Sequence, residues 1–349
     1  MTIDQLINFA RSKNASDIHL TAGAPTSIRI NGELKKFDGM DEEVVNRTIL
    51  SMLSAEQEKR LGQGEDIDFS FTCSSGGRQR VNVYHQNGGR LAAAIRLLNE
   101  HIPSFKDISL PQAAIDLTKE LKGLILVTGP TGSGKSTTLA TMVDYINVCR
   151  PCHILTIEDP IEYIYSPKLA TIHQREIGTD VPDFNYALRS GLRENPDVIL
   201  VGEMRDYETI QLALTAAETG HLVLGTLHTT GAAQTINRII DVFPSDVQNQ
   251  IRSQLSGNLR GVISQMLLPM ANIERGRTAA FEILINNDAC ANNIRAEKTH
   301  QLQAVMASNM NTGMRTMNES LKRLSRDGVI TKETAMTYSP DKDELKQML

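Results

Sequence analysis

The stretch GLILVTGPTGSGKSTTL, residues 123–139, decides the fold of this chain. The apolar run LILV at 124–127 predicts a buried strand, and the residues that follow Gly134 predict a helix. Between them, Gly129-x-x-x-x-Gly134-Lys135-Ser136 has the spacing of a P-loop. Its glycines let backbone N–H groups turn inward around phosphates, and the helix N-terminus adds partial positive charge. The stretch therefore predicts a nucleotide-binding α/β domain.

The phosphate cradle should include the loop and the first helical turn. Lys135 would reach the β- and γ-phosphates, and the Ser136 hydroxyl would ligate Mg²⁺. A dinucleotide fingerprint does not fit, because Thr137 stands where a third glycine is needed. The predicted ligands are therefore ATP and Mg²⁺. The predicted binding residues are Gly129, Thr131, Gly132, Ser133, Gly134, Lys135, Ser136 and Thr137.

Strand-like and helical segments alternate from about residue 112 onward, which predicts a parallel sheet covered on both faces. The strands expected here are GLILVTG, HILTIED, DVILVGE and HLVLGTLH, and the last seventy residues look helical. We therefore expect an ATPase domain over 112–349, with helices at its C-terminal end.

The first hundred residues have period-two patterning with glycine turns, which predicts a small α/β domain with a mainly antiparallel sheet. After an N-terminal helix, Asn31-Gly32 predicts a hairpin turn, and one helical stretch is expected over 42–61. Three further strand-like runs follow, at 66–72, 78–86 and 90–98. The expected domain spans 1–99, and a linker with two prolines spans 100–111.

Hydrolysis also needs a positioned water and stabilisation of developing charge. Glu203 follows the strand DVILV, at the sheet edge where ligands bind, and is our candidate to orient and deprotonate water. Glu158 and Glu162 form a carboxylate run suited to Mg²⁺-bound water, with Glu158 a candidate second metal contact. His228 follows its strand and could sense the γ-phosphate, whereas His221 precedes the same strand, where histidine is usually structural.

Composition argues against several other classes of protein. The chain has 349 residues, of which 40% are hydrophobic and 22% charged, as in soluble two-domain proteins. The N-terminal residues lack the pattern of a secretory signal, so we expect none, and the apolar runs are far too short to cross a bilayer. A net charge of −5 and 4% aromatic residues disfavour nucleic-acid binding. We expect a cytoplasmic protein that reaches membranes only through partners.

The segment CRPCH at 149–153 has the Cys-x-x-Cys-His spacing of c-type haem attachment. Four cysteines without an export signal favour reduced thiols in the cytosol, where such attachment does not normally occur. No second Cys pair completes a zinc site. We interpret Cys149 and Cys152 as parts of a connecting turn before a strand that begins at His153.

Four motifs in order resemble the Walker A, Asp box, Walker B and His box of the secretion ATPase superfamily. They are GPTGSGKSTTLA, HILTIEDPIEY, LRENPDVILVGEMRD and TGHLVLGTLHTT, respectively. Their order and sequences are most similar to those of the type IV pilus retraction ATPase (PilT) family, and the similarity runs from SDIHLTAG near the start to GMRTMNESL near the end. The resemblance implies a PAS-like N-terminal domain, a RecA-like ATPase domain and a homohexamer. It also implies docking on the inner-membrane platform protein of a pilus, at the inner face of the cytoplasmic membrane.

By this resemblance Glu203 is the catalytic carboxylate, and Glu158 and Glu162 belong to the Asp box. His221 and His228 form the His-box pair. The resemblance also implies that two arginines of the first domain, Arg80 and Arg96, reach a nucleotide held by another part of the ring. Surface arginines on a sheet are otherwise usually only solvated.

One segment departs from the family pattern. Where retraction ATPases have AIRNLIRE followed by GKTHQ, this chain has ACANNIRA followed by EKTHQ, so Ala291 and Ala296 replace an arginine and a glutamate. This puts in doubt the coupling of hydrolysis to retraction. The alternatives left open are a pilus-assembly or type II secretion ATPase and a nucleotide-dependent regulator with little turnover. An ABC-type ATPase is discounted, because LSGN at 255–258 follows the Walker B strand and lacks the rest of that signature.

Overall fold

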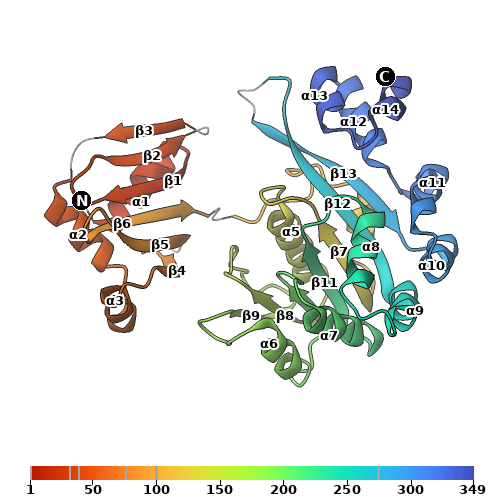
Figure 1. Ribbon diagram of the computed structural model, residues 1–349, viewed down its shortest axis with the longest axis horizontal. Coiled ribbons are helices and arrows are strands. Elements are labelled where there is room, and N and C mark those ends of the chain that lie inside the picture. Colours follow the sequence, from red (N-terminus) through yellow and green to blue (C-terminus); the bar gives the residue numbers. More distant parts are fainter. Residues whose placement is uncertain (1, 31–32, 38–39, 75–76, 99–100, 273–275) are drawn as a thin grey trace. The chain divides into compact units, whose positions relative to one another are not determined.

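The computed structural model describes residues 2–30, 33–37, 40–74, 77–98, 101–272 and 276–349. The chain forms two compact units, one of residues 1–101 and 160–164, the other of residues 102–159 and 165–349 (Figure 1). Among the described residues, no helix is long and apolar enough to cross a membrane. The domain boundaries expected from the sequence stay a prediction.

Unit 1 contains one antiparallel sheet whose strands lie in the order β3-β2-β1-β6-β5-β4. Its strands are β1 (Ala15–Thr21), β2 (Thr26–Ile30), β3 (Glu33–Phe37), β4 (Ile67–Thr72), β5 (Arg78–Gln86) and β6 (Arg90–Leu97). Its helices are α1 (Ile3–Ser12), α2 (Glu42–Leu50) and α3 (Ala55–Gly62). The expected antiparallel sheet and N-terminal helix are therefore confirmed. The expected Asn31-Gly32 turn lies outside the described residues.

Alternate residues of these strands enter the core of unit 1. Ile18 of β1, Val81 of β5 and Ile95 of β6 are buried there with Leu6 of α1 and Ile49 of α2. Because successive side chains of a strand point to opposite faces, one face of the sheet packs on the helices and the other does not.

The single helix expected over 42–61 is wrong, because the structure has two helices there. Helix α2 ends at Leu50, and Ser54 begins α3 with a reciprocal cap. The Gln57 N–H donates to Ser54 Oγ at 3.3 Å, and the Ser54 N–H donates to Gln57 Oε1 at 2.9 Å. The Ser-x-x-Gln spacing indicates the start of a helix, but the apolar pattern of the segment, read alone, does not.

Unit 2 contains a seven-stranded sheet in the order β13-β12-β7-β11-β10-β8-β9, with every pair parallel except β12–β13. The strands are β7 (Gly123–Thr128), β8 (His153–Glu158), β9 (Thr171–Glu176), β10 (Val198–Val201), β11 (Leu222–Leu227), β12 (Leu259–Pro269) and β13 (Arg277–Ile285). The helices are α4 (Gln112–Leu117), α5 (Lys135–Cys149), α6 (Phe184–Gly191), α7 (Tyr207–Glu218), α8 (Ala232–Asp241), α9 (Gln248–Asn258), α10 (Asp288–Arg295), α11 (Leu302–Ser308), α12 (Met317–Arg326), α13 (Lys332–Tyr338) and α14 (Lys342–Met348).

The four strands expected in this unit are present as β7, β8, β10 and β11, but β9, β12 and β13 were not expected. The expectation that the last seventy residues are helical is wrong at its start, since β13 extends to Ile285. Short apolar runs such as those of β12 and β13 do not distinguish a buried strand from a buried helix. Figure 1 shows the long β12–β13 hairpin, on which α12–α14 pack through Leu268, Leu321 and Leu345.

Three neighbouring strands carry the predicted chemistry. Strand β11 pairs with β7 on one side and β10 on the other, and all three run parallel. Because the carboxyl ends of parallel strands meet at one edge of a sheet, the residues after Thr128, Val201 and Leu227 come together there. The fold therefore brings the P-loop, Glu203 and His228 to one place.

We predict that Ser54→Ala frays the start of α3. Loss of an N-cap hydroxyl costs about 1 kcal/mol, or about a five-fold change in a local opening equilibrium. Hydrogen exchange followed by mass spectrometry should therefore show about five-fold faster exchange in the first turn of α3. Ser51→Ala is the control, because the Ser51 hydroxyl donates to the Thr48 carbonyl at the end of α2 and does not cap a helix start. Equal exchange in Ser54→Ala and the parent protein would contradict the assigned cap.

Candidate nucleotide site

The P-loop conformation depends on glycine at defined positions. Gly129 has φ 145°, and a Cβ there would lie 2.2 Å from the Gln265 carbonyl oxygen. Gly134 has φ 89° and directly precedes the first residue of α5. Both conformations are ones that other residues rarely adopt. The glycines therefore let the chain turn from β7 into α5 while lying against β12.

The cradle residues differ in exposure. Thr131, Gly132 and Ser136 are exposed, whereas Ser133 is buried. Ser136 lies in the first turn of α5, where backbone N–H groups have no partner within the helix. The Thr137 carbonyl accepts a hydrogen bond from the Thr141 hydroxyl at 2.8 Å. The loop therefore presents an accessible hydroxyl beside a helix N-terminus, as an anion site requires.

Lys135 connects the P-loop to the end of β11. Its Nζ donates to the carbonyls of Gly129 at 2.9 Å and Pro130 at 3.1 Å. It also lies 3.4 Å from Nδ1 of His228. Because an ammonium group can only donate, Nδ1 of His228 is the acceptor in this contact.

The second ring nitrogen connects His228 to Glu203. Nε2 of His228 lies 2.8 Å from Oε1 of Glu203, so an N–H on Nε2 points at the carboxylate. Lysine, histidine and glutamate thus form one chain of polar contacts across the ends of β7, β11 and β10. The structure brings together these three residues predicted from the sequence.

Arg205 contacts both oxygens of the same carboxylate. Its Nε lies 2.5 Å from Oε1 of Glu203, and its Nη2 lies 2.7 Å from Oε2. Burial alone would raise the pKa of Glu203, but the hydrogen bonds and charge of Arg205, together with His228, outweigh burial and lower it. Glu203 is therefore ionised near neutral pH and can accept a proton or a hydrogen bond from water.

Sequence reasoning missed two residues of this site. Arg205 lies in the quoted segment LRENPDVILVGEMRD, two residues after Glu203, and that spacing was the available signal. Gln265 of β12 is buried, donates to the Ser133 carbonyl at 2.6 Å, and accepts from the Thr138 hydroxyl at 2.8 Å. Gln265 lies more than 120 residues from the P-loop in the sequence and carries no local signal.

Of the other predicted residues, Glu158 lies at the same carboxyl edge of the sheet, because it ends β8, which pairs in parallel with β10. Its Oε1 accepts from the hydroxyl of Thr156 at 2.7 Å. Glu162 lies in segment 160–164, which groups with unit 1. His221 precedes β11, at the opposite end of that strand from His228, and its Nδ1 lies 3.0 Å from the Ala216 carbonyl oxygen. The proposed roles of these three residues stay predictions.

Arg80 and Arg96 are cross-strand partners on β5 and β6 of unit 1. Both are exposed, and both lie on the face of the sheet that points away from the core of that unit. Nε of Arg96 lies 3.1 Å from Oδ1 of Asp17. Two arginines 16 positions apart in the sequence are therefore neighbours on one face of the sheet.

The CRPCH segment has the place expected for a turn. Cys149 is the last residue of α5, and His153 is the first residue of β8. Both cysteines are free thiols, and burial raises the pKa of Cys152. Nε2 of His153 lies 3.0 Å from Nδ1 of His173 on β9. The segment therefore joins the P-loop helix to the next strand.

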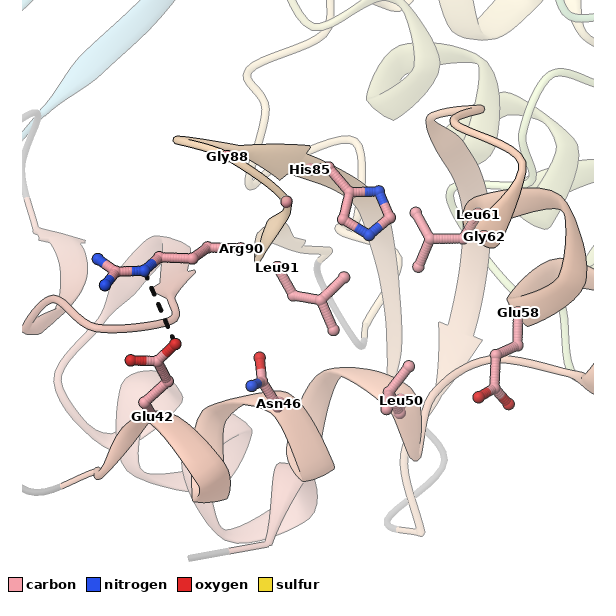
Figure 2. A pocket seen from close by; sticks show the side chains of 11 residues that line it. Glu42, Asn46, Leu50, Glu58, Leu61, Gly62, His85, Gly88, Arg90 and Leu91 are labelled. Atoms are coloured by element: carbon pink, nitrogen blue, oxygen red, sulfur yellow. Dashed lines mark ion pairs between the residues drawn. The ribbon is translucent and has the colours of Figure 1, made fainter.

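A separate cavity of about 470 Å³ lies in unit 1, between α2, α3 and the β5–β6 turn (Figure 2). Glu42 and Arg90 face each other beside it, as Figure 2 shows. Nε of Arg90 lies 3.8 Å from Oε1 of Glu42. Leu50, Leu61 and Leu91 also line it. This cavity shares no residue with the P-loop site.

Comparison with known proteins identifies the family of this chain. The model of the type II/IV secretion system protein family matches residues 1–336. The chain belongs to this family. Among secretion system proteins it is 44% identical to the type IV pilus retraction ATPase PilT of Pseudomonas aeruginosa, over 96% of this chain and 97% of that protein. It is 46% identical to a twitching motility protein of Neisseria gonorrhoeae, over 91% of this chain and 85% of that protein.

Two solved structures have the same fold. A crystal structure of the pilus retraction motor PilT with bound ADP matches with a TM-score of 0.93 and 48% identity, covering 99% of both chains. The ATPase DotB of Legionella pneumophila matches with a TM-score of 0.83 and 28% identity, covering 97% of this chain and 95% of that chain. The expected two-domain α/β fold of a secretion ATPase is therefore confirmed.

We predict that Arg205→Ala moves the acid limb of kcat/KM for ATP hydrolysis to higher pH. The lowered pKa of Glu203 keeps the carboxylate ionised until the pH falls below the usual range of glutamate. Without the arginine, burial is less opposed, so the carboxylate takes up a proton at higher pH. The exposed Arg238 of α8 gives the control variant Arg238→Ala, and circular dichroism should show that each protein stays folded across the range. An acid limb at the same pH in Arg205→Ala and the parent protein would contradict this role.

Proposed function

We propose that this secretion system protein is an ATP-hydrolysing motor that drives retraction of a type IV pilus. The observation that carries the proposal is the contact chain Lys135–His228–Glu203, which joins a P-loop to an ionised carboxylate. Full-length similarity to pilus retraction ATPases supports the choice of motor.

The P-loop holds the phosphates of ATP through backbone N–H groups and Lys135. The exposed Ser136 hydroxyl offers an oxygen donor, which is the ligand type that Mg²⁺ prefers, so this site fits that ion. Glu158 is the second candidate, acting through a water. When bound there, the ion would supply positive charge that offsets the charge of the phosphates. The chain itself supplies the cradle and the oxygen donors.

Glu203 orients a water toward the γ-phosphate and accepts its proton. His228 and Arg205 both donate to this carboxylate, so the orientation of the Glu203 side chain at the edge of the sheet is fixed. Because His228 also contacts Lys135, a change in the bound phosphates that moves Lys135 is transmitted to Glu203 through the side chain of His228. This geometry suits in-line attack by water, in which positioning and electrostatic stabilisation supply most of the catalysis.

The motor works as a homohexamer. Arg80 and Arg96 of the PAS-like unit stabilise charge on a nucleotide held by another part of the ring, and Glu162 and His221 act within the same assembly. The ring docks in the cytoplasm on the inner-membrane platform protein of the pilus and reaches the membrane only through that partner. Nucleic acid has no part in this function.

We predict that Lys135→Ala abolishes ATP binding, whereas Glu203→Gln keeps binding and lowers turnover about 10²-fold or more. The lysine supplies a positive contact to the phosphates, and the glutamate supplies the base. Binding is measured with a fluorescent ATP analogue, and turnover by steady-state phosphate release.

The matched control is Cys149→Ser with Cys152→Ser, which changes two thiols in a connecting turn and should leave turnover nearly unchanged. Parent-level hydrolysis by Glu203→Gln would overturn the assignment of the base. Negligible turnover by the parent protein would instead favour the nucleotide-dependent regulator.

A further inference from the structure

A row of charged side chains crosses the sheet of unit 1. Arg29 of β2 pairs with Asp17 of β1, Asp17 pairs with Arg96 of β6, and Arg96 pairs with Arg80 of β5. Residues directly opposite each other in antiparallel strands share one face of the sheet. Four successive strands therefore align three arginines and one aspartate.

The row lies on the face that does not pack on the helices of unit 1. The next residues along these strands, Ile28, Ile18, Ile95 and Val81, are buried in the core of the unit. Side chains of adjacent residues point to opposite faces. The three guanidinium groups and the carboxylate therefore stand on the opposite surface, where three positive charges face one negative charge.

Asp17 is the anchored member of the row. Its Oδ1 lies 3.1 Å from Nε of Arg96, and its Oδ2 lies 3.8 Å from Nε of Arg29. The neighbouring Ser16 hydroxyl donates to Oδ2 at 2.8 Å. The Asp17 side chain is 17% exposed and that of Arg96 is 67% exposed. A partly buried carboxylate therefore binds Nε of Arg96, while most of the Arg96 side chain is exposed.

We propose that Asp17 is the positioning residue for Arg96, and this inference rests on the proposed action of Arg96 on a nucleotide elsewhere in the ring. Asp17 binds Nε, so the terminal nitrogens of the guanidinium stay available for the paired contacts that arginine makes with phosphate oxygens. Arg29 and Ser16 occupy the other carboxylate oxygen, which leaves Oδ1 to Arg96. The aspartate thus fixes the direction of the arginine before the nucleotide meets it.

The test is a double-mutant cycle in the full-length protein, with assembly of every variant checked by light scattering. We expect Arg96→Ala to lower kcat about 10³-fold. Asp17→Asn should lower kcat about ten-fold, with KM for ATP changed less than about two-fold. In the Arg96→Ala background, Asp17→Asn should change kcat by less than about two-fold, because its effect passes through the arginine.

Two further variants separate positioning from a general structural role. Asp17→Glu keeps the negative charge but changes its position, so its kcat should lie between the values of the parent protein and Asp17→Asn. If Asp17→Asn assembles poorly, Asp17→Glu replaces it in the cycle. Glu42→Gln is the control, because it breaks the Glu42–Arg90 ion pair in the same unit (Figure 2) and should leave kcat within about two-fold.

The outcomes distinguish this inference from the proposed function. An equal loss from Asp17→Asn in the parent and Arg96→Ala backgrounds would show that Asp17 acts independently of Arg96 and would overturn the inference. A loss in Arg96→Ala with none in Asp17→Asn would also overturn it, while leaving the action of Arg96 intact. Parent-level kcat in Arg96→Ala would remove the proposed role of Arg96 and the inference with it.

Discussion

The contact chain from Lys135 through His228 to Glu203 is the interaction on which the site depends. Each residue follows a different strand, so the chain forms only when β7, β11 and β10 are adjacent and parallel. The buried apolar residues of these strands set that arrangement, and the polar residues follow at the carboxyl edge. Packing in the core thereby determines the distance between the P-loop and the carboxylate of Glu203.

Features encoded by local sequence could be predicted. The P-loop needs glycine at fixed positions and a strand before and a helix after it, and all of these are visible in 17 consecutive residues, 123–139. The central strands of the parallel sheet were also found, because each is a short apolar run bounded by turn residues. Glu203 and His228 could then be placed beside the P-loop from the rule that such strands end at one edge.

Features that depend on distant contacts could not be predicted. Gln265 of β12 donates a hydrogen bond to the Ser133 carbonyl of the P-loop, and nothing near Gln265 in the sequence indicates this contact. The β12–β13 hairpin has apolar runs without a helical or alternating period, so periodicity could not assign it. Arg80 and Arg96 were singled out by resemblance alone, and only the strand register shows that they share a face with Asp17 and Arg29.

Pilus retraction in living cells tests the central claim most directly. The parent protein and Glu203→Gln would each be expressed at equal levels in a bacterium that makes type IV pili but lacks its own retraction motor, and retraction events of labelled pili would be counted. We expect the parent protein to restore retraction and Glu203→Gln to restore none, because the base is lost while nucleotide binding remains. Equal retraction with both proteins would contradict the account, as would no retraction with a parent protein that hydrolyses ATP and assembles at the pilus base.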